Sequence, residues 1–359
     1  MFSFLLIFFL HTSTLNSIEP NELIDRLKGN VLIDVRSPAE YESGHIPGSV
    51  NIPIFSNDER AIVGTLYKQK GRKVAMISAL EIVGPKMADF VREASKYKYT
   101  EYLIIHCWRG GMRSSTFAWL LNTADTPAIT LENGYKGFRN HILSFFEQTF
   151  DIRILTGFTG SGKSDLLRYM KASGQQVVDL ESLASHKGSS FGALGQNPQP
   201  TSEQFHNDLF WALKDFDIEK PVWMEDESMS IGKVFIPEPL WKQMRSSPLF
   251  RVDLCLQERL NRLVAEYACF DKNDLTSAIE RISKRLGGQN AKLALDELDK
   301  KNFRRVAEIL LAYYDKSYNK SIEERKNQIV FEKEYKNLDM HIISSDLIDS
   351  SNKLIYAKS

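Results

Sequence analysis

Short apolar runs rich in β-branched residues alternate along the chain with stretches of helical periodicity. This alternation is typical of parallel sheets with helices on their faces, because the connection between two parallel strands usually carries a helix. In the first half of the chain the pattern predicts three strands and two helices. The strands are Val31–Val35, Tyr102–His106 and Ala128–Leu131, and the helices are Ser114–Leu121 and Lys136–Phe146.

The second half repeats the pattern with more helix. Helices are predicted to begin at Lys163, Glu203, Pro239 and Gln257, and Leu275–Lys320 is predicted to be largely helical. Together the two halves indicate an α/β protein with two successive parallel sheets and a helical part towards the C-terminus. The predicted strands of the second half are Ile152–Thr156, Gln176–Leu180, Val222–Glu225, Phe250–Leu256 and His341–Ser344.

The length of 359 residues favours two domains, because a single hydrophobic core stops growing at about 250–300 residues. One unit is expected to end with the helix at Phe146, and Asp151 opens the next strand. We therefore expect an apolar N-terminal extension at 1–19, a first domain at 20–147 and a second domain with a helical C-terminal part at 148–359.

The apolar run Met1–Leu10 is too short to span a bilayer. A secretory signal would carry basic residues before such a run, but the first basic residue is Arg26. We interpret the run as a non-functional extension or a misassigned start, in preference to an export signal. A cytoplasmic enzyme without membrane contact is the expected result.

The charge balance and the cysteine content limit which binding partners and metal sites the chain is expected to have. The 46 basic and 46 acidic residues give a formal net charge of zero, so a nucleic-acid partner would need a local basic face. The three cysteines form no CxxC pair, which argues against a zinc site or a disulfide framework and is typical of a reducing cytosol.

A glycine-containing loop joins the predicted strand that ends at His106 to the helix that begins at Ser114. Such a loop turns backbone N–H groups inward as an anion-binding nest, at a helix N-terminus that favours negative charge. The same field stabilises a thiolate, so Cys107 is predicted to be a low-pKa nucleophile and not a buried structural cysteine. The predicted anion-binding residues of the loop are Trp108, Arg109, Gly110, Gly111, Met112 and Arg113.

The loop alone also satisfies the His-Cys-x-x-Gly-x-x-Arg-Ser signature of cysteine phosphatases. The surrounding segments Leu32–Tyr41, Gly44–Pro53 and Gly134–Phe138 resemble rhodanese domains instead, over roughly residues 20–147. That resemblance implies sulfur or selenium carried as a persulfide-type adduct on Cys107.

The segment Gly157–Ser164 is a full match to GxxxxGK(S/T), placed between a predicted strand and a predicted helix as this motif requires. Its backbone N–H groups would hold a diphosphate, Lys163 would reach the phosphate oxygens, and Ser164 would ligate Mg²⁺. Asp179–Glu181 and Glu225–Glu227 are candidate acidic partners, with solvated acidic turns as the alternative. The predicted diphosphate-binding residues are Gly157, Phe158, Thr159, Gly160, Ser161, Gly162, Lys163 and Ser164.

A rhodanese-like domain followed directly by a P-loop domain resembles the tRNA 2-selenouridine synthase family. The resemblance implies conversion of wobble 2-thiouridine in tRNA to 2-selenouridine through an S-geranyl intermediate. It also implies geranyl diphosphate and selenophosphate as co-substrates, Mg²⁺ with the diphosphate, and a selenophosphate-producing enzyme as a partner. The motifs that carry the resemblance are Gly64–Thr65, Tyr67–Gln69, Cys107–Ser114, Asp179–Glu181, Ser185–Gly192, Pro198–Pro200, Glu225–Ser228, Ile231–Gly232, Ile236–Pro237, Pro239–Leu240 and Arg285–Gly288.

Two other function classes stay open at this point. One is a sulfurtransferase or cysteine phosphatase fused to an ATP-using P-loop domain, and the other is a non-catalytic phosphate-binding scaffold. A tRNA-binding face is a further hypothesis, with salt-bridged solvent-exposed helices as the alternative. The basic positions considered are Arg259, Arg262, Arg281, Lys284, Arg285, Lys300, Lys301, Arg304 and Arg305.

Overall fold

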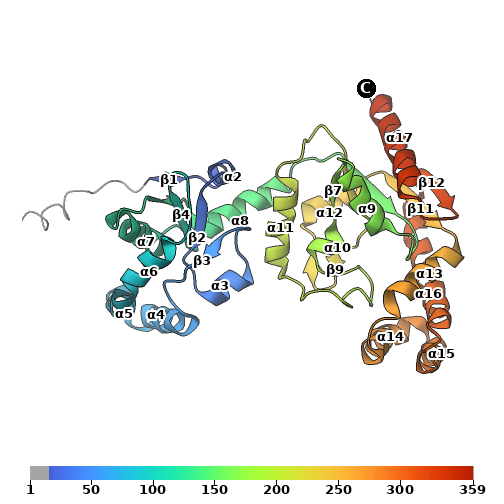
Figure 1. Cartoon of the computed structure of the whole chain (residues 1–359), viewed down its shortest axis with the longest axis horizontal. Coiled ribbons are helices and arrows are strands. Elements are labelled where there is room, and N and C mark those ends of the chain that lie inside the picture. Colours follow the sequence, from blue (N-terminus) through green and yellow to red (C-terminus); the bar gives the residue numbers. More distant parts are fainter. Residues whose placement is uncertain (1–15, 359) are drawn as a thin grey trace, which may run out of the picture. The chain divides into compact units, whose positions relative to one another are not determined.

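The computed structural model describes residues 16–358, so the apolar run Met1–Leu10 lies outside the described residues. The chain divides into two compact units, the first ending at Phe145 and the second beginning at Phe146 (Figure 1). Each unit is described separately below. Within residues 16–358, none of the helices combines the length and the apolar content needed to cross a membrane.

The first unit is built on a parallel five-stranded sheet with the order β1-β5-β4-β2-β3. The three predicted strands are confirmed as β2, β4 and β5. Both β4 and β5 are buried at every position, which explains their uninterrupted apolar patterns. The strands are β1 (Ser17–Ile18), β2 (Val31–Asp34), β3 (Val50–Asn51), β4 (Leu103–His106) and β5 (Ala128–Leu131).

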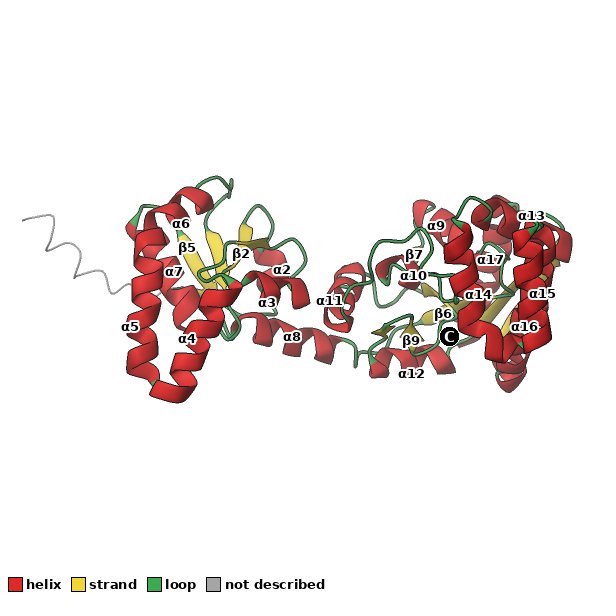
Figure 2. Ribbon diagram, turned by 90° about the horizontal axis from the view of Figure 1, so that it is seen from below, coloured by secondary structure: helices red, strands yellow, loops and turns green. Residues whose placement is uncertain are grey.

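Helices surround this sheet. Helix α7 packs against β4 and β5 through the buried side chains of Phe117, Ala118 and Leu121. Helices α4 and α5 form a long antiparallel hairpin (Figure 2). The helices are α2 (Leu23–Arg26), α3 (Pro38–Ser43), α4 (Asn57–Lys70), α5 (Arg72–Val83), α6 (Met87–Ala94), α7 (Met112–Thr123) and α8 (Gly134–Phe145), with the short 3-10 helix η1 (Gly84–Lys86) before α6.

The second unit contains another parallel five-stranded sheet, with the order β12-β11-β6-β8-β7. Strands β6 and β8 are adjacent and completely buried. A separate antiparallel pair is formed by β9 and β10. The strands are β6 (Ile152–Thr156), β7 (Gln176–Val178), β8 (Val222–Glu225), β9 (Ser230–Ile231), β10 (Val234–Phe235), β11 (Leu249–Leu254) and β12 (Ile329–Tyr335).

Much of the second unit is helical, as expected for Leu275–Lys320. Helices α14, α15 and α16 pack side by side around their own apolar core (Figure 2). The helices are α9 (Lys163–Ala172), α10 (Leu180–Leu183), α11 (Ser202–Leu213), α12 (Glu238–Ser246), α13 (Leu256–Tyr267), α14 (Lys272–Leu286), α15 (Gly288–Asp299), α16 (Phe303–Glu324) and α17 (Met340–Lys358), and η2 (Lys326–Gln328) is a 3-10 turn.

One strand prediction was wrong. The segment His341–Ser344 lies in α17, whose first turn is capped where the Asp339 carboxylate accepts a hydrogen bond from the Ile342 N–H at 3.0 Å. The side chains of Ile343 and Leu347 enter the core one helical turn apart. The strand near this segment is β12, which lies at the edge of the sheet. Its charged and apolar residues are mixed, so the sequence pattern did not indicate a strand there.

Candidate active site

Cys107 follows the last residue of β4, a strand in the interior of the first sheet, and its loop leads directly into α7. Only 3% of the residue is exposed. The N-terminus of α7 therefore points its free N–H groups towards the loop, which favours a negative charge there. This is the strand–loop–helix arrangement that the sequence predicted for an anion-binding cysteine loop.

The turn between β5 and α8 holds this loop in place. The N–H groups of Tyr135 and Lys136 donate to the carbonyl oxygens of Cys107 and Trp108 at 2.8 and 2.9 Å. Gly134 has φ +53°, and a β-carbon on it would lie 2.2 Å from the Cys107 carbonyl oxygen. The segment Gly134–Phe138, which resembles rhodanese domains in the sequence, thus supports the backbone of the cysteine loop.

Ser114, in the first turn of α7, sets the environment of the thiol. Its hydroxyl lies 3.2 Å from the Cys107 sulfur. Burial alone would raise the pKa of Cys107, but the Ser114 side chain and N–H, the Arg113 charge and the Arg109 N–H together lower it below its ordinary value. Ser114 was not among the predicted site residues, although its place in the first turn of α7 puts it beside the loop.

The two arginines of the Cys107 loop differ in whether a carboxylate already pairs with them. Arg113 forms an ion pair with Glu40 of α3 at 2.9 Å, so its guanidinium is already engaged by a carboxylate. Arg109 is exposed, as is Met112. Trp108 packs beside Tyr135, with ring centroids 5.6 Å apart. Of the two predicted cations, Arg109 is therefore the one that is free to meet an incoming anion.

A buried ion pair stabilises the strand next to β4. Arg36 donates to Asp34 through two nitrogens, the shorter bond being 2.6 Å, and both side chains are almost completely buried. Arg36 also donates to the Gly44 carbonyl oxygen at 2.7 Å. This geometry assigns Asp34 and Arg36 to the fold and not to the chemistry.

The second site is the loop between β6 and α9. Gly157 passes so close to β11 that a β-carbon would lie 1.9 Å from the Val252 carbonyl oxygen. Gly160 and Gly162 have positive φ angles of +84° and +74°, which curl the loop around the start of α9. Lys163 is the first residue of α9 and donates to the Gly157 carbonyl oxygen at 2.7 Å. The loop therefore has the form of a phosphate cradle.

Several groups in this loop are left for a ligand. The Ser161 hydroxyl is buried and has no hydrogen-bond partner among the described residues. A wide polar pocket opens at the loop and is lined by Thr159, Gly160, Gly162, Lys163 and Ser164. The pocket also carries both signs of charge. Its cationic residues are Lys163, Arg168, Lys187, Arg245, Arg262 and Arg325, and its acidic residues are Asp165, Asp179, Glu181, Asp226, Glu227 and Glu266.

Acidic residues from two strand ends converge on this loop. The Ser164 hydroxyl donates to Glu181 at 2.7 Å. Burial and the neighbouring Glu181 charge raise the pKa of Glu227 to about 8. Burial also raises the pKa of Glu225, which accepts a hydrogen bond from the Leu180 N–H at 3.0 Å. Both predicted acidic segments thus reach the phosphate cradle, so neither is a solvated turn.

Residues far away in the sequence support the loop from behind. Arg259 of α13 donates to the Thr159 carbonyl oxygen at 2.8 Å and is paired with Asp315 of α16. The Tyr318 hydroxyl accepts from the Gly157 N–H at 2.9 Å and contacts the Thr156 hydroxyl. Arg259 was considered for tRNA contact, but it is only 3% exposed and cannot serve there. Sequence reasoning missed Tyr318 altogether.

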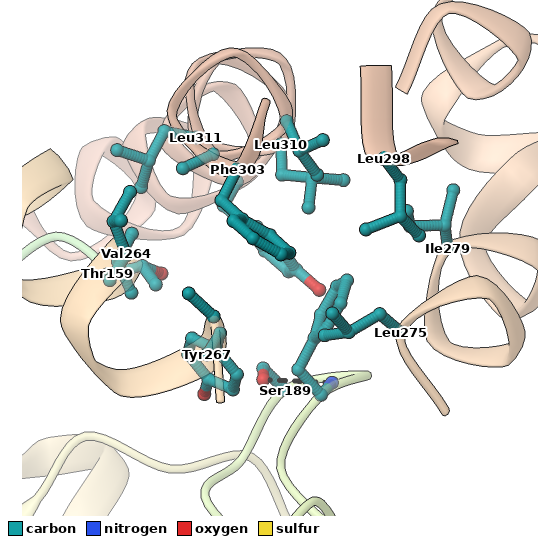
Figure 3. Close-up of a pocket in the computed structure, with 16 residues that line it drawn as sticks. Thr159, Ser189, Val264, Tyr267, Leu275, Ile279, Leu298, Phe303, Leu310 and Leu311 are labelled. Atoms are coloured by element: carbon teal, nitrogen blue, oxygen red, sulfur yellow. Dashed lines mark hydrogen bonds between the residues drawn. The ribbon is translucent and has the colours of Figure 1, made fainter. Parts of the chain in front are cut away.

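An apolar pocket adjoins the polar one. Side chains from α13, α14, α15 and α16 point towards one another there, beside the loop residue Thr159 (Figure 3). Thr159, Ser189, Leu263, Tyr267 and Tyr314 line both pockets. The other lining residues are Phe191, Val264, Ala268, Leu275, Ile279, Leu298, Phe303, Val306, Ala307, Leu310 and Leu311.

The Gly-rich segment 186–192 lies where the two pockets meet. Lys187 and Gly188 line the polar pocket, and Phe191 lines the apolar one. Gly188 has φ +63°, and a β-carbon on it would meet the Glu227 carboxylate at 2.5 Å. The segment is therefore packed against the site and is more than an ordinary surface loop.

The fold and the two loops place this protein among enzymes that combine a rhodanese-like domain with a P-loop domain. Residues 19–141 match the rhodanese-like domain family, and residues 150–346 match the tRNA 2-selenouridine synthase AAA domain. The tRNA 2-selenouridine synthase of Nitrosomonas eutropha is 32% identical over 82% of this chain and 89% of that protein. The chain belongs to the tRNA 2-selenouridine synthase family and is an enzyme.

Other relatives extend the comparison. The tRNA 2-selenouridine synthase of Bdellovibrio bacteriovorus is 30% identical over 89% of this chain and 96% of that protein. Among solved structures, the N-terminal domain of a putative ATP/GTP binding protein from Clostridium difficile is 35% identical and covers 36% of this chain and 99% of that chain, with a TM-score of 0.33.

Proposed function

We propose that the enzyme replaces the sulfur of wobble 2-thiouridine in tRNA by selenium in two steps. Geranyl diphosphate is the first co-substrate and selenophosphate the second, and S-geranyl-2-thiouridine is the intermediate. The observation that carries the first step is the shared wall between the phosphate cradle and the apolar pocket. A prenyl diphosphate has a charged head and an apolar chain, and the two pockets offer one site for each.

In the first step the thiocarbonyl sulfur attacks the allylic carbon of geranyl diphosphate. A carbon–sulfur bond forms, the carbon–oxygen bond breaks, the diphosphate leaves with the electron pair, and the base loses its ring N–H proton. The N–H groups of Gly160, Gly162, Lys163 and Ser164, which line the polar pocket, and the Lys163 ammonium would stabilise the negative charge of the departing diphosphate. The Gly157 and Phe158 N–H groups already donate to Tyr318 and Asp253. Burial lowers the pKa of Lys163, and the nearby carboxylates of Glu181 and Glu227 oppose this shift.

The donor atoms near Ser164 fit Mg²⁺. Its hydroxyl and the Glu181 carboxylate are the hard oxygen donors that Mg²⁺ prefers, and buried carboxylates with raised pKa values gain from a nearby cation. Among residues 16–358 no group of three or more His, Cys, Asp or Glu side chains is arranged to hold a metal alone. This agrees with Mg²⁺ bound partly by the substrate phosphates. When bound, the ion would neutralise charge on the leaving diphosphate.

In the second step selenium takes the place of the S-geranyl group. A persulfide-type selenium adduct on Cys107 would require an oxidant, because the selenium of selenophosphate is already fully reduced. We therefore assign the Cys107 thiolate to attack on the base carbon, where it expels the geranyl thiolate. Selenium of selenophosphate then attacks the same carbon and releases Cys107, and water cleaves the phosphorus–selenium bond to free phosphate.

The Cys107 loop is suited to this role. Its N–H groups and the exposed Arg109 would hold the phosphate part of selenophosphate, and the lowered pKa of Cys107 favours the thiolate form. Because the substrate is tRNA, the proposal also places the enzyme in the cytoplasm and gives it a selenophosphate-producing enzyme as a partner.

A reciprocal pair of variants tests the assignment. Lys163→Ala should block geranylation of 2-thiouridine tRNA but keep most of the selenation activity on ready-made S-geranylated tRNA. Cys107→Ser should do the opposite and accumulate S-geranylated tRNA. Mass spectrometry of the wobble nucleoside reads both products. Cys107→Ser enzyme that selenates at the wild-type rate would overturn the thiolate assignment.

A direct competition distinguishes the ligands of the P-loop. Titration calorimetry should show geranyl diphosphate bound more tightly than ATP, because only the prenyl compound fills the apolar pocket. Tight ATP binding with tRNA-stimulated hydrolysis, and no response to geranyl diphosphate, would favour the ATP-using alternative.

A further inference from the structure

The tip of the α4–α5 hairpin is a dense group of cations. Lys68, Lys70, Arg72 and Lys73 lie within six residues around Gly71, and all four are exposed. Within residues 16–358 none of them has an acidic side chain in salt-bridge range, in contrast to Lys300, which pairs with its neighbour Glu297. An unneutralised basic tip on a chain of zero net charge is the local basic face that an RNA substrate requires.

The hairpin is connected to the Cys107 loop at two points. Near its tip, an Arg72 guanidinium nitrogen lies 3.7 Å from the sulfur of Met112, the first residue of α7 and the end of the loop. Further along α4, Arg60 pairs with Glu40 at 3.6 Å, and Glu40 in turn pairs with Arg113 of the loop. The basic tip therefore lies beside the start of α7, where the Cys107 loop ends.

The hairpin also exposes large apolar side chains. Tyr67, next to Lys68, is 58% exposed, and Ile62, Ile77 and Leu80 are each at least half exposed. An exposed aromatic ring among unpaired cations is the combination that binds single-stranded RNA, since bases stack on the ring and phosphates meet the cations.

We propose that the α4–α5 hairpin binds the anticodon arm of tRNA and presents the wobble base to Cys107. Lys68, Lys70, Arg72 and Lys73 contact its phosphates, and Tyr67 stacks on an unpaired base of the loop. This inference rests on the proposed function, because it assumes that the base must reach Cys107 for selenation. It adds a surface and a role to the segment Tyr67–Gln69, which the chemistry of the two loops leaves unused.

The charge part is tested with full-length enzyme and S-geranylated tRNA over a salt titration. A variant with alanine at the four cations of the tip should bind more weakly, and the slope of log affinity against log salt should become shallower by up to about 3. A control variant with the same loss of charge in the same unit should keep the wild-type slope. Its alanines replace Lys28, Arg92, Lys96 and Lys98, which are exposed and lie outside the hairpin.

The stacking part is tested at Tyr67. Tyr67→Ala should weaken tRNA binding about 10-fold, whereas Tyr67→Phe, which keeps the ring, should bind like wild type. The rate of Cys107 alkylation by iodoacetamide should be unchanged in all hairpin variants, which shows that the loop itself remains intact.

The outcomes separate this inference from the proposed function. An unchanged salt slope in the four-cation variant overturns the RNA-binding role of the hairpin, whatever Cys107→Ser does. If tRNA binding is unaffected but selenophosphate delivery by its producing enzyme is impaired, the hairpin is a protein-docking surface and the inference is wrong. If Cys107→Ser keeps its selenation activity while the hairpin variants lose tRNA binding, the assignment of the Cys107 thiolate fails and the RNA-binding surface stands.

Discussion

Substituting Gly134 by alanine is the sharpest single perturbation of the cysteine loop. The residue has φ +53°, and the added β-carbon would lie 2.2 Å from the Cys107 carbonyl oxygen and 2.5 Å from the Gly110 nitrogen. Ordinary contacts of a β-carbon begin near 3.4 Å. Both opposing atoms belong to the backbone, so no flexible side chain can move away to relieve the overlap.

The energetic consequence follows from two contributions. A left-handed conformation costs a residue with a β-carbon about 1–2 kcal/mol, and overpacking of a well-packed site costs about 1–3 kcal/mol. The Gly134→Ala variant should therefore lose about 2–5 kcal/mol in the free energy of unfolding of the first unit. Since a domain is stable by about 5–15 kcal/mol, the unit should still fold, with the Cys107 loop displaced by roughly 1 Å.

In the Gly134→Ala variant the selenation rate should fall by a larger factor than the stability of the first unit suggests. A displacement of that size at a reacting group can lower a rate about 100-fold. Selenation of S-geranylated tRNA should fall by this factor in single-turnover assays, while geranylation by the second unit should be unchanged. Urea denaturation of the full chain measures the stability of the first unit.

Gly111→Ala is the matched control in the same loop. A β-carbon there has no neighbour within 4 Å, and its φ of −97° suits any residue, so the free energy of unfolding should not decrease. Wild-type stability and selenation in Gly134→Ala would refute the inference that the β5–α8 turn positions Cys107.

Three further predictions address the thiol, the apolar pocket and the buried ion pair. Ser114→Ala should raise the pKa of Cys107, so the midpoint of the pH profile of its alkylation should move to higher pH. Ala307→Phe should raise KM for geranyl diphosphate about 10- to 100-fold by filling the pocket, without changing inhibition by inorganic diphosphate. Arg36→Ala should lower the free energy of unfolding by about 3–5 kcal/mol at neutral pH. The folded-state pKa of Asp34 is lowered, so its stabilisation is present above its ordinary pKa and is lost as the pH falls through the folded value. Wild type and Arg36→Ala should therefore converge in acid, and a constant difference across the pH range would contradict this assignment.

The sequence by itself determined the two loops and the strands that lead into them. Residues 107–113 and Gly157–Ser164 are continuous segments, and their glycines and flanking helix starts can be recognised from the chain alone. The buried strands β4, β5, β6 and β8 were equally readable, because strands covered on both faces are apolar throughout. Such features depend on neighbours in the chain, which a single sequence displays directly.

Only the tertiary structure decided what surrounds those loops. Ser164 meets Glu181, and Gly157 meets Tyr318, through contacts between distant segments that no local pattern records. The apolar pocket requires four helices whose inward faces look in the sequence like ordinary core stripes. The sequence pattern missed edge strand β12 and predicted a strand at the start of helix α17 for a related reason. A half-exposed edge strand has a weak apolar pattern, whereas a short β-branched run at a helix start resembles a strand until its capping and packing are seen.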